Sequence, residues 1–263
     1  TGAVASVKSE DITMNPGVNP MDALQGKIAG LDITNSSGQA GSSPTVQLRG
    51  TRSLQLDEDG NISSDAFKPT YIIDGMPGDI ATLNPNDIES IEVLKDASST
   101  AIYGSSGANG VIIVTTKRGS EGRNDVTVNA YVGVQQIAKR LEMLNAREYA
   151  VMLNQQDVLS NQEPSIENPS VYGKGTDWQD EILRLAFMQN YQVAASGGNK
   201  DGRYYLSLSM FDQDGVIKNS GIRRYQTRLN LDRKMRHNIN IGANFQFSYT
   251  QREPNLVSLG GFD

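Results

Sequence analysis

The feature that most constrains the fold of this chain is a strict alternation of residue types with period two from residue 124 onward. Apolar side chains alternate there with polar or small ones in successive segments. Successive side chains of a β-strand point to opposite faces, so such segments predict strands whose two faces meet different surroundings. The five expected strands cover about 125–136, 189–197, 203–212, 223–233 and 239–251.

The lengths and connections of these segments favour a sheet that crosses a membrane. Most of them have about nine to eleven residues, which is the length of a tilted strand that spans a bilayer. The connections alternate between long, such as 137–187, and short, such as GGNKDG. Outer-membrane barrels have short periplasmic turns and longer outer loops, so 137–187 is expected to be extracellular. A soluble antiparallel sheet with one wet face is the alternative.

The first part of the chain, residues 1–120, has a different composition and predicts helices mixed with strands. It carries all of the net charge of −6, and the remainder is neutral. Helical patterns in NPMDALQGKIAG and NPNDIESIEVLKDAS alternate with apolar runs in PTVQLRG, PTYIIDG and GVIIVTTKRG. In the second helical pattern, Glu89 and Glu92 are expected on one helix face, with Lys95 beyond them.

Long ordered motifs in this part resemble one family of membrane proteins. LQGKIAGLDITNSSGQAGSSPTVQLRGTRSL, PTYIIDGMP and LNPNDIESIEVLKDASSTAIYGSSGANGVIIVTTKRG resemble the plug domain of TonB-dependent outer-membrane transporters, in the SusC/RagA branch of Bacteroidetes. YYLSLSMFDQDGVIKNSGIRRYQTRLNLD resembles the first barrel strands of that branch. The resemblance implies an α+β plug domain, 1–120, followed by antiparallel transmembrane β-strands, 121–263, of a β-barrel with about 22 strands. Five strands cannot close a barrel, so we expect a segment of a longer chain.

The resemblance implies active import of oligosaccharides or peptides across the bacterial outer membrane. In that family the inner-membrane protein TonB opens the plug, which fills the periplasmic side of the barrel lumen, and a SusD-like surface lipoprotein usually caps the barrel. A dimer of transporter–lipoprotein pairs in outer-membrane lipid is expected. A non-transporting receptor or adhesin on the same scaffold is the alternative, because a fold does not fix a function. A soluble carbohydrate-binding sandwich is a third interpretation.

No residue set typical of an enzyme is present in the sequence. It has no Cys and a single His, His237, in a short turn beside Arg236. It has neither a Walker loop nor clustered ligands for a catalytic metal. The longest apolar run has five residues, so no membrane-spanning helix is expected. The acidic composition gives no sign of nucleic-acid binding. We expect no catalytic residues and no cofactor.

Charged residues of the two parts are expected to meet between plug and barrel wall. In the resembled family, buried charges at this boundary hold the plug in place. Ion pairs in a wet lumen break at modest cost, which suits a plug that must move, although ordinary surface ion pairs are the alternative. The candidates are Arg49, Glu89, Glu92 and Lys95 on the plug, with Arg228 and Asp232 on the lumen side of the wall.

Two plug loops, 51–68 and 76–82, are expected to face the substrate. Their side chains suited to hydrogen bonds with sugar hydroxyls or peptide termini are Arg52, Asp57, Asp59 and Asp79. Plain solvation of these loops is the alternative.

The first of these loops also partly matches an EF-hand. Asp57 and Asp59 stand at positions three and five of such a loop. Gln55 and Ala66 replace its first and last acidic ligands, so the calcium pattern is incomplete. No metal site is predicted, and calcium is the one ion that this pattern leaves open.

Five plug glycines are expected to be structural. They stand where the chain must turn with positive φ or approach another backbone closely. These residues are Gly50, Gly75, Gly104, Gly107 and Gly110. The motif YGSSGANGV precedes a strand instead of following one, which argues against a nucleotide-binding loop.

A surface helix is expected within the long loop. Asn145 and Glu148 have the spacing of a capping box at its start. The helix is expected to pack on the barrel mouth, with Met152 and the sole tryptophan, Trp178, as packing residues.

Overall fold

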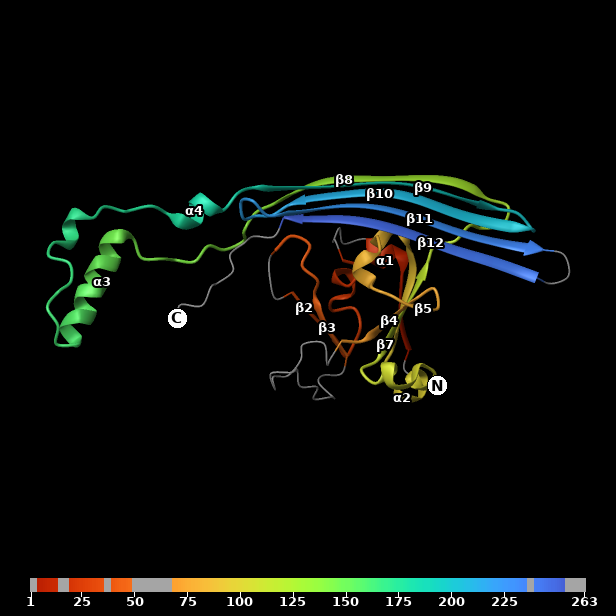
Figure 1. Cartoon of the computed structure of the whole chain (residues 1–263), viewed down its shortest axis with the longest axis horizontal. Helices are drawn as coiled ribbons and strands as arrows, with labels where there is room; N and C mark the ends of the chain where they lie inside the picture. The colour runs from red at the N-terminus through yellow and green to blue at the C-terminus, as the bar shows by residue number, and fades with distance from the viewer. Residues whose placement is uncertain (1–3, 14–18, 36–38, 49–67, 236–238, 254–263) are drawn as a thin grey trace.

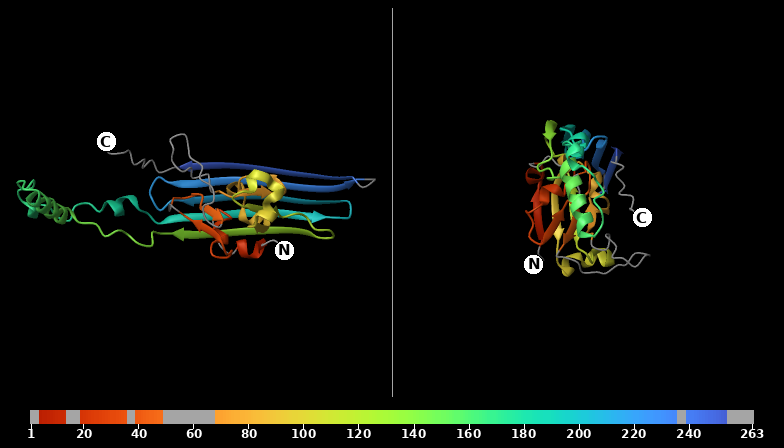
Figure 2. Two further views of the ribbon diagram at one scale, coloured as in Figure 1. Left: turned by 90° about the horizontal axis from the view of Figure 1, so that it is seen from below. Right: turned by 90° about the vertical axis from the view of Figure 1, so that its left-hand side faces the viewer.

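In the computed structural model, the two compositional parts of the chain form two structural units (Figure 1). The structure describes residues 4–13, 19–35, 39–48, 68–235 and 239–253. An N-terminal unit lies beneath one face of a broad curved sheet, and an arm that carries two helices extends beyond one end of that sheet (Figures 1 and 2).

The N-terminal unit is built on a five-stranded mixed sheet in the order β1-β6-β7-β4-β5. Its strands are β1 (Val4–Lys8), β4 (Thr70–Ile73), β5 (Met76–Pro77), β6 (Ile88–Leu94) and β7 (Val111–Thr116). Only β4 and β7 pair in parallel. A separate hairpin pairs β2 (Leu31–Thr34) with β3 (Thr45–Leu48).

Short helical segments cover this sheet and complete an α+β unit, as the sequence predicts. They are α1 (Ser9–Thr13), α2 (Ala97–Thr100) and the 3₁₀ turns η1 (Asp22–Leu24), η3 (Ile80–Thr82), η4 (Pro85–Asp87) and η5 (Ala101–Gly107). The core between these segments and the sheet is aliphatic, and Ile12, Leu24 and Ile91 are fully buried in it.

The helix predicted over residues 84–98 is wrong, because its central part is strand β6. The apolar residues at positions 88, 91 and 94 fit a helical spacing, but β6 lies between β1 and β7 and pairs with both. Ile88, Ile91 and Val93 are completely buried there. Strand pairing on both sides and β-branched side chains outweigh the local pattern.

The helix predicted over residues 19–30 is also reduced, in this case to the single 3₁₀ turn η1. Gly26 and Gly30 have φ angles of 73° and 80°. These left-handed conformations are incompatible with a continuous right-handed helix.

The curved sheet consists of five long antiparallel strands in the order β12-β11-β10-β9-β8. They are β8 (Asn124–Gln135), β9 (Ala186–Gly198), β10 (Gly202–Asp214), β11 (Gly221–Met235) and β12 (Ile239–Glu253). All five predicted strands are present, and each predicted end lies within three residues of the observed one. Strand pairing follows chain order, so each strand is hydrogen-bonded to the next.

The face of this sheet that points away from the N-terminal unit, here the outward face, carries apolar side chains in register across the strands. The three central cross-strand rows are Val126-Ala195-Leu206-Leu229-Phe245, Val128-Val193-Leu208-Thr227-Phe247 and Ala130-Tyr191-Met210-Tyr225-Tyr249. The next row toward the arm is polar on four strands, with Gln189, Asp212, Arg223 and Gln251. These rows form an apolar belt, which ends at the polar row on β10, β11 and β12 and continues on β8 and β9 with Val132, Val134 and Phe187.

The arm, residues 136–185, carries α3 (Ala146–Leu159), η6 (Pro169–Val171) and α4 (Trp178–Ile182). The predicted capping box is present: the Glu148 N–H donates to the Asn145 side chain and the Asn145 N–H donates to the Glu148 carboxylate, both at 2.9 Å. The predicted packing on the barrel mouth is wrong within the described chain, because α3 packs against η6 at the far end of the arm. Trp178 is accordingly 73% exposed.

No helix among the described residues has the length and hydropathy needed to span a membrane.

Candidate functional site

The inward face of the curved sheet, which points toward the N-terminal unit, is polar and yet buried. Gln192, Tyr205, Ser207, Arg228 and Asn230 are each at most 4% exposed. They alternate along their strands with the exposed apolar belt, as the period of two requires. Because buried polar groups need partners, the N-terminal unit must supply hydrogen bonds to them.

The first set of contacts centres on Asp74, in the two-residue turn between β4 and β5. Asp74 and Gly75 both have positive φ, 49° and 89°, and Ile73 pairs with Met76, which is the geometry of a type I′ hairpin turn. The turn holds the Asp74 carboxylate at the end of β7. There it accepts hydrogen bonds from the Thr116 N–H at 3.0 Å and the Thr116 hydroxyl at 2.6 Å.

Asp74 also forms an ion pair across the boundary between the units. Arg228 Nη1 on β11 lies 3.4 Å from Asp74 Oδ2, and both side chains are almost completely buried. The same nitrogen donates to the Thr116 hydroxyl at 3.3 Å, and Nη2 donates to Gln246 of β12. Asn230 donates to the Thr116 hydroxyl at 3.0 Å. The buried guanidinium is therefore held by acceptors from both units.

The second set of contacts centres on Asp87, the last residue of turn η4. Asn84 caps this turn, since its side chain accepts the Asn86 N–H at 2.9 Å. Asp87 Oδ1 accepts hydrogen bonds from Gln192 Nε2 at 2.6 Å and the Tyr205 hydroxyl at 2.8 Å. Burial raises the pKa of Asp87 above its usual value, although these hydrogen bonds and nearby positive charges oppose the shift.

A third set joins turn η3 to the two strands nearest the sheet edge. Gln246 donates to the Thr82 carbonyl at 2.9 Å and to the Thr82 hydroxyl at 3.1 Å. Gln226 also donates to the Thr82 carbonyl. Together the three sets engage β9, β10, β11 and β12, so the N-terminal unit is fixed to most of the sheet width by polar contacts.

The connection between the units, residues 117–123, is held against the ends of the strands. Arg118 Nη1 lies 2.9 and 3.1 Å from the two carboxylate oxygens of Asp232. Gly119 runs so close to the sheet that a Cβ there would lie 2.2 Å from the carbonyl oxygen of Gly197 and 2.4 Å from that of Tyr204. Only glycine fits this crossing.

Comparisons with known proteins agree with this arrangement. Residues 1–111 match the family model of the TonB-dependent receptor plug domain. The chain is 36% identical to TonB-dependent receptor P26 of Formosa agariphila and 34% identical to TonB-dependent receptor SusC of Bacteroides thetaiotaomicron, over 99% of this chain and 26% of each relative. It superposes on the RagAB peptide importer in its closed-closed state with a TM-score of 0.80 and 30% identity, covering 95% of this chain and 31% of that one.

The chain belongs to the SusC/RagA-like TonB-dependent receptors. It spans about a quarter of the length of these curated relatives. The N-terminal unit is therefore the plug, and β8 to β12 form part of the wall of a larger barrel. The three sets of polar contacts described above are the interface between plug and wall.

The predicted wall residues lie in this interface, but with partners other than those expected. Arg228 contacts Asp74, and Asp232 contacts Arg118. Among the expected plug partners, Lys95 donates to the Ala29 carbonyl within the plug. Glu89 and Glu92 lie on strand β6, not on a helix, and form no ion pair with a described residue. Arg49 lies outside the described residues.

The predicted substrate-facing residues are largely untested by the structure. Arg52, Asp57 and Asp59, with the incomplete calcium pattern, lie outside the described residues. Asp79 is exposed, and its carboxylate caps η3 by accepting the Ala81 N–H at 2.9 Å. Within the described part of the chain, no three His, Asp or Glu residues cluster as metal ligands do.

The predicted structural glycines have positive φ or a close neighbour wherever they are described. Gly104 and Gly110 have φ angles of 58° and 92°. A Cβ on Gly107 would lie 2.7 Å from the carbonyl oxygen of Thr100. Gly50 lies outside the described residues, and Gly75 forms the hairpin turn described above.

Proposed function

We propose that this chain is the plug and the first wall strands of a transporter that imports oligosaccharides or peptides across the outer membrane by using energy relayed through TonB. The observation that carries the proposal is the buried and predominantly polar interface between plug and wall. TonB-dependent receptors are outer-membrane proteins. Pairing with a SusD-like lipoprotein, and a dimer of such pairs, are parts of the same proposal. The function requires no resident cofactor.

The apolar belt supports placement of the wall in lipid. On β11 the outward residues change from Arg223 to Tyr225 at one boundary and from Leu231 to Arg233 at the other. The stretch between the two arginines has nine residues, Arg224 to Asp232. A tilted strand needs about nine to eleven residues to cross the hydrocarbon core. Tyrosines occur at both boundaries, as in the aromatic girdles of outer-membrane barrels.

The polarity of the interface supports a plug that moves. A hydrogen bond between plug and wall contributes a net stabilisation of about 0.5–1.5 kcal/mol, because water replaces it when the plug leaves. If the interface were apolar, movement of the plug would expose hydrophobic surface to the aqueous lumen, at a free-energy cost of about 25 cal/mol per Å². Among the described residues, apolar contact between the units occurs where Ala40 and Gly41 lie against the wall cluster Met188, Phe211 and Ile222.

Substrate class is supported by the relatives alone. One neighbour is a peptide importer, which favours peptides, and oligosaccharides stand as a candidate from the resemblance of the sequence motifs. The runner-up function is a receptor that binds a ligand at the cell surface without importing it. Nothing in the plug–wall interface requires passage of a substrate, so the two functions differ only in whether the plug opens.

The deciding experiment measures uptake by cells that produce the whole transporter. The cells receive a labelled mixture of oligosaccharides and peptides, and the material recovered inside and on the cells is identified by mass spectrometry. Import that disappears when TonB is deleted, while surface binding persists, supports the proposal. Surface binding without import in cells with intact TonB would establish the receptor function instead.

A further inference from the structure

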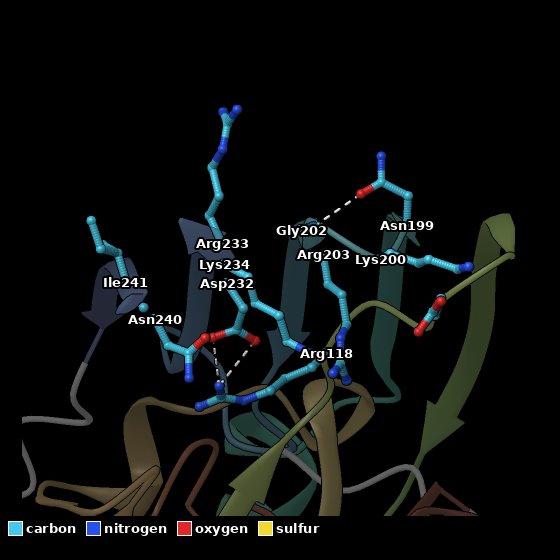
Figure 3. A pocket seen from close by; sticks show the side chains of 12 residues that line it. Arg118, Asn199, Lys200, Gly202, Arg203, Asp232, Arg233, Lys234, Asn240 and Ile241 are labelled. Carbon is cyan, nitrogen blue, oxygen red and sulfur yellow. Dashed lines mark hydrogen bonds and ion pairs between the residues drawn. The ribbon is translucent and has the colours of Figure 1, made fainter. Parts of the chain in front are cut away.

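A second polar site lies at the end of the wall opposite the arm, where the chain passes from the plug into β8. Figure 3 shows a pocket of about 310 Å³ around the ends of β9 to β12. Its lining contains five cationic residues and two acidic ones. The cations are Arg118, Lys200, Arg203, Arg233 and Lys234.

Four of these cations have no carboxylate partner among the described residues. Asp232, one of the two acids, is engaged by Arg118. Lys200, Arg203, Arg233 and Lys234 are exposed and form no ion pair with any residue that the structure describes. At the opposite end of the wall, by contrast, Arg223 is 3.0 Å from Asp212 and Arg184 is 3.2 Å from Asp214. Lys218 and Arg252 at the arm end likewise form no ion pair with a described residue, but at the plug-entry end four such cations line one pocket.

The position of this pocket relative to the apolar belt indicates which anion it meets. Arg233 lies on the outward face, in register with Gly202 and Ile241, one row beyond the belt residues Tyr204 and Leu231. One row is two residues, or about 7 Å along the strand. The headgroup layer on each side of a bilayer is about 5–7 Å thick. The cations therefore lie at the depth of lipid headgroups if the belt lies in the hydrocarbon core.

The side chains reach this layer from both faces of the wall. In Figure 3, Arg233 points away from the plug, whereas Arg203 and Lys234 lie on the plug side near Arg118. Arg233 is therefore the cation of this set on the lipid side, with Lys200 in the turn between β9 and β10, whereas Arg203 and Lys234 face the lumen.

We propose that Arg233, together with Lys200 in the turn at the rim of this pocket, binds the phosphodiester of an anionic phospholipid in the leaflet at the plug-entry end of the barrel. The proposal rests on the membrane placement in the proposed function. The bound headgroup carries one negative charge, which offsets part of this positive charge, and it anchors the strand ends at a fixed depth. Cationic residues near a charged bilayer surface attract anionic lipids in this way.

The test measures lipid binding to the whole transporter, purified in neutral detergent, by native mass spectrometry. The probes are phosphatidylglycerol, which is anionic, and phosphatidylcholine, which has the same phosphodiester but no net charge. The test variant is Lys200→Gln/Arg233→Gln. The matched control, Lys174→Gln/Lys218→Gln, removes two exposed cations at the other end of the molecule.

We expect the wild-type transporter to prefer phosphatidylglycerol. Each cation near the surface contributes about fivefold in affinity, so the test variant should bind this lipid roughly 30-fold more weakly, and the control should not change. Raising the salt concentration to about 0.5 M should weaken the preference. Equal binding of the two lipids, or unchanged binding by the test variant, would overturn the proposal, and so would displacement of the lipid by millimolar inorganic phosphate.

Uptake assays on the same variants separate this proposal from the proposed function. Both substituted side chains are exposed, and heat-dependent migration of the folded barrel on a gel reports whether the variants fold. Loss of lipid binding with uptake retained supports the pocket independently of transport. If the wild-type protein prefers the anionic lipid but shows no TonB-dependent uptake, the import function is contradicted and the lipid proposal is not.

Discussion

The ion pair between Asp74 and Arg228 provides the sharpest test of the plug–wall interface. The change is Asp74→Asn in the whole transporter, because Asn tolerates the positive φ of 49° and its side-chain oxygen can still accept the Thr116 N–H. The substitution removes the negative charge that faces Arg228, whose guanidinium is almost completely buried. The docked plug should therefore lose stability relative to the undocked plug.

The size of this loss follows from the geometry. Removing one partner of a buried ion pair costs about 3–5 kcal/mol. The separation here is 3.4 Å, and Arg228 keeps the Thr116 hydroxyl and Gln246 as acceptors, so the cost lies at or just below the lower end of this range. We expect about 2–3 kcal/mol, which corresponds to about a 30- to 150-fold larger undocked fraction.

The assay is ion conductance of the purified transporter in a planar bilayer, since an undocked plug leaves the lumen open. Asp74→Asn and Arg228→Gln should each raise the open fraction, and the double variant should be less open than the sum of the two effects predicts. The exposed pair Arg118–Asp232, with side chains 40% and 34% exposed, is the matched control. Its removal should cost at most about 1 kcal/mol. Additive effects of Asp74→Asn and Arg228→Gln, or equal effects of the two pairs, would refute the reasoning.

Three further predictions concern other parts of the structure. Because the pKa of Asp87 is raised in the docked plug, the docked plug binds more protons than the undocked one. The ion conductance through the barrel should therefore fall as the pH decreases toward 3.8. Asp87→Asn should flatten this dependence of conductance on pH. Gly119→Ala should lower the melting temperature of the folded barrel, because overpacking at this position costs about 1–3 kcal/mol. Ser120→Ala, at the exposed neighbouring residue, should leave the melting temperature unchanged. Equal melting temperatures of the two variants would contradict the close approach of Gly119 to the sheet. Asn145→Ala should destabilise α3 by about 1 kcal/mol, which should appear as faster amide hydrogen exchange in the arm alone. Slower or unchanged exchange would show that the capping box does not stabilise the helix.

The wall is predictable from the sequence because its signal is local. A period of two assigns each residue to a face, so the alternation along β11 is enough to place Arg228 and Asp232 toward the lumen. The resemblance supplies the plug and its position. The capping box of Asn145 and Glu148 is likewise readable, since both partners lie within one turn.

The partners across the interface are not predictable, because they depend on register over long separations. Asp74 meets Arg228 154 positions later, and Asp87 meets Tyr205 118 positions later. Nothing near Asp74 distinguishes it from any other Asp-Gly turn. Glu89 and Glu92 are equally suitable by charge, but the position of β6 between two other strands directs them elsewhere. Tertiary pairing overrides the local helical pattern there.

The charge distribution connects these observations to gating. All of the net charge of −6 belongs to residues 1–120, and the buried plug carboxylates Asp74 and Asp87 meet donors of the wall, including Arg228. In the proposed transport cycle, an acidic plug is attracted to a lumen that presents cations and amides, so it would return after displacement without any large apolar surface to bury. In a wet lumen, charges that separate are resolvated, which keeps the work of opening small. A plug held by hydrophobic contacts would instead dock more firmly as its contact area grows, and a pull from the periplasm would have to overcome that larger energy in every cycle.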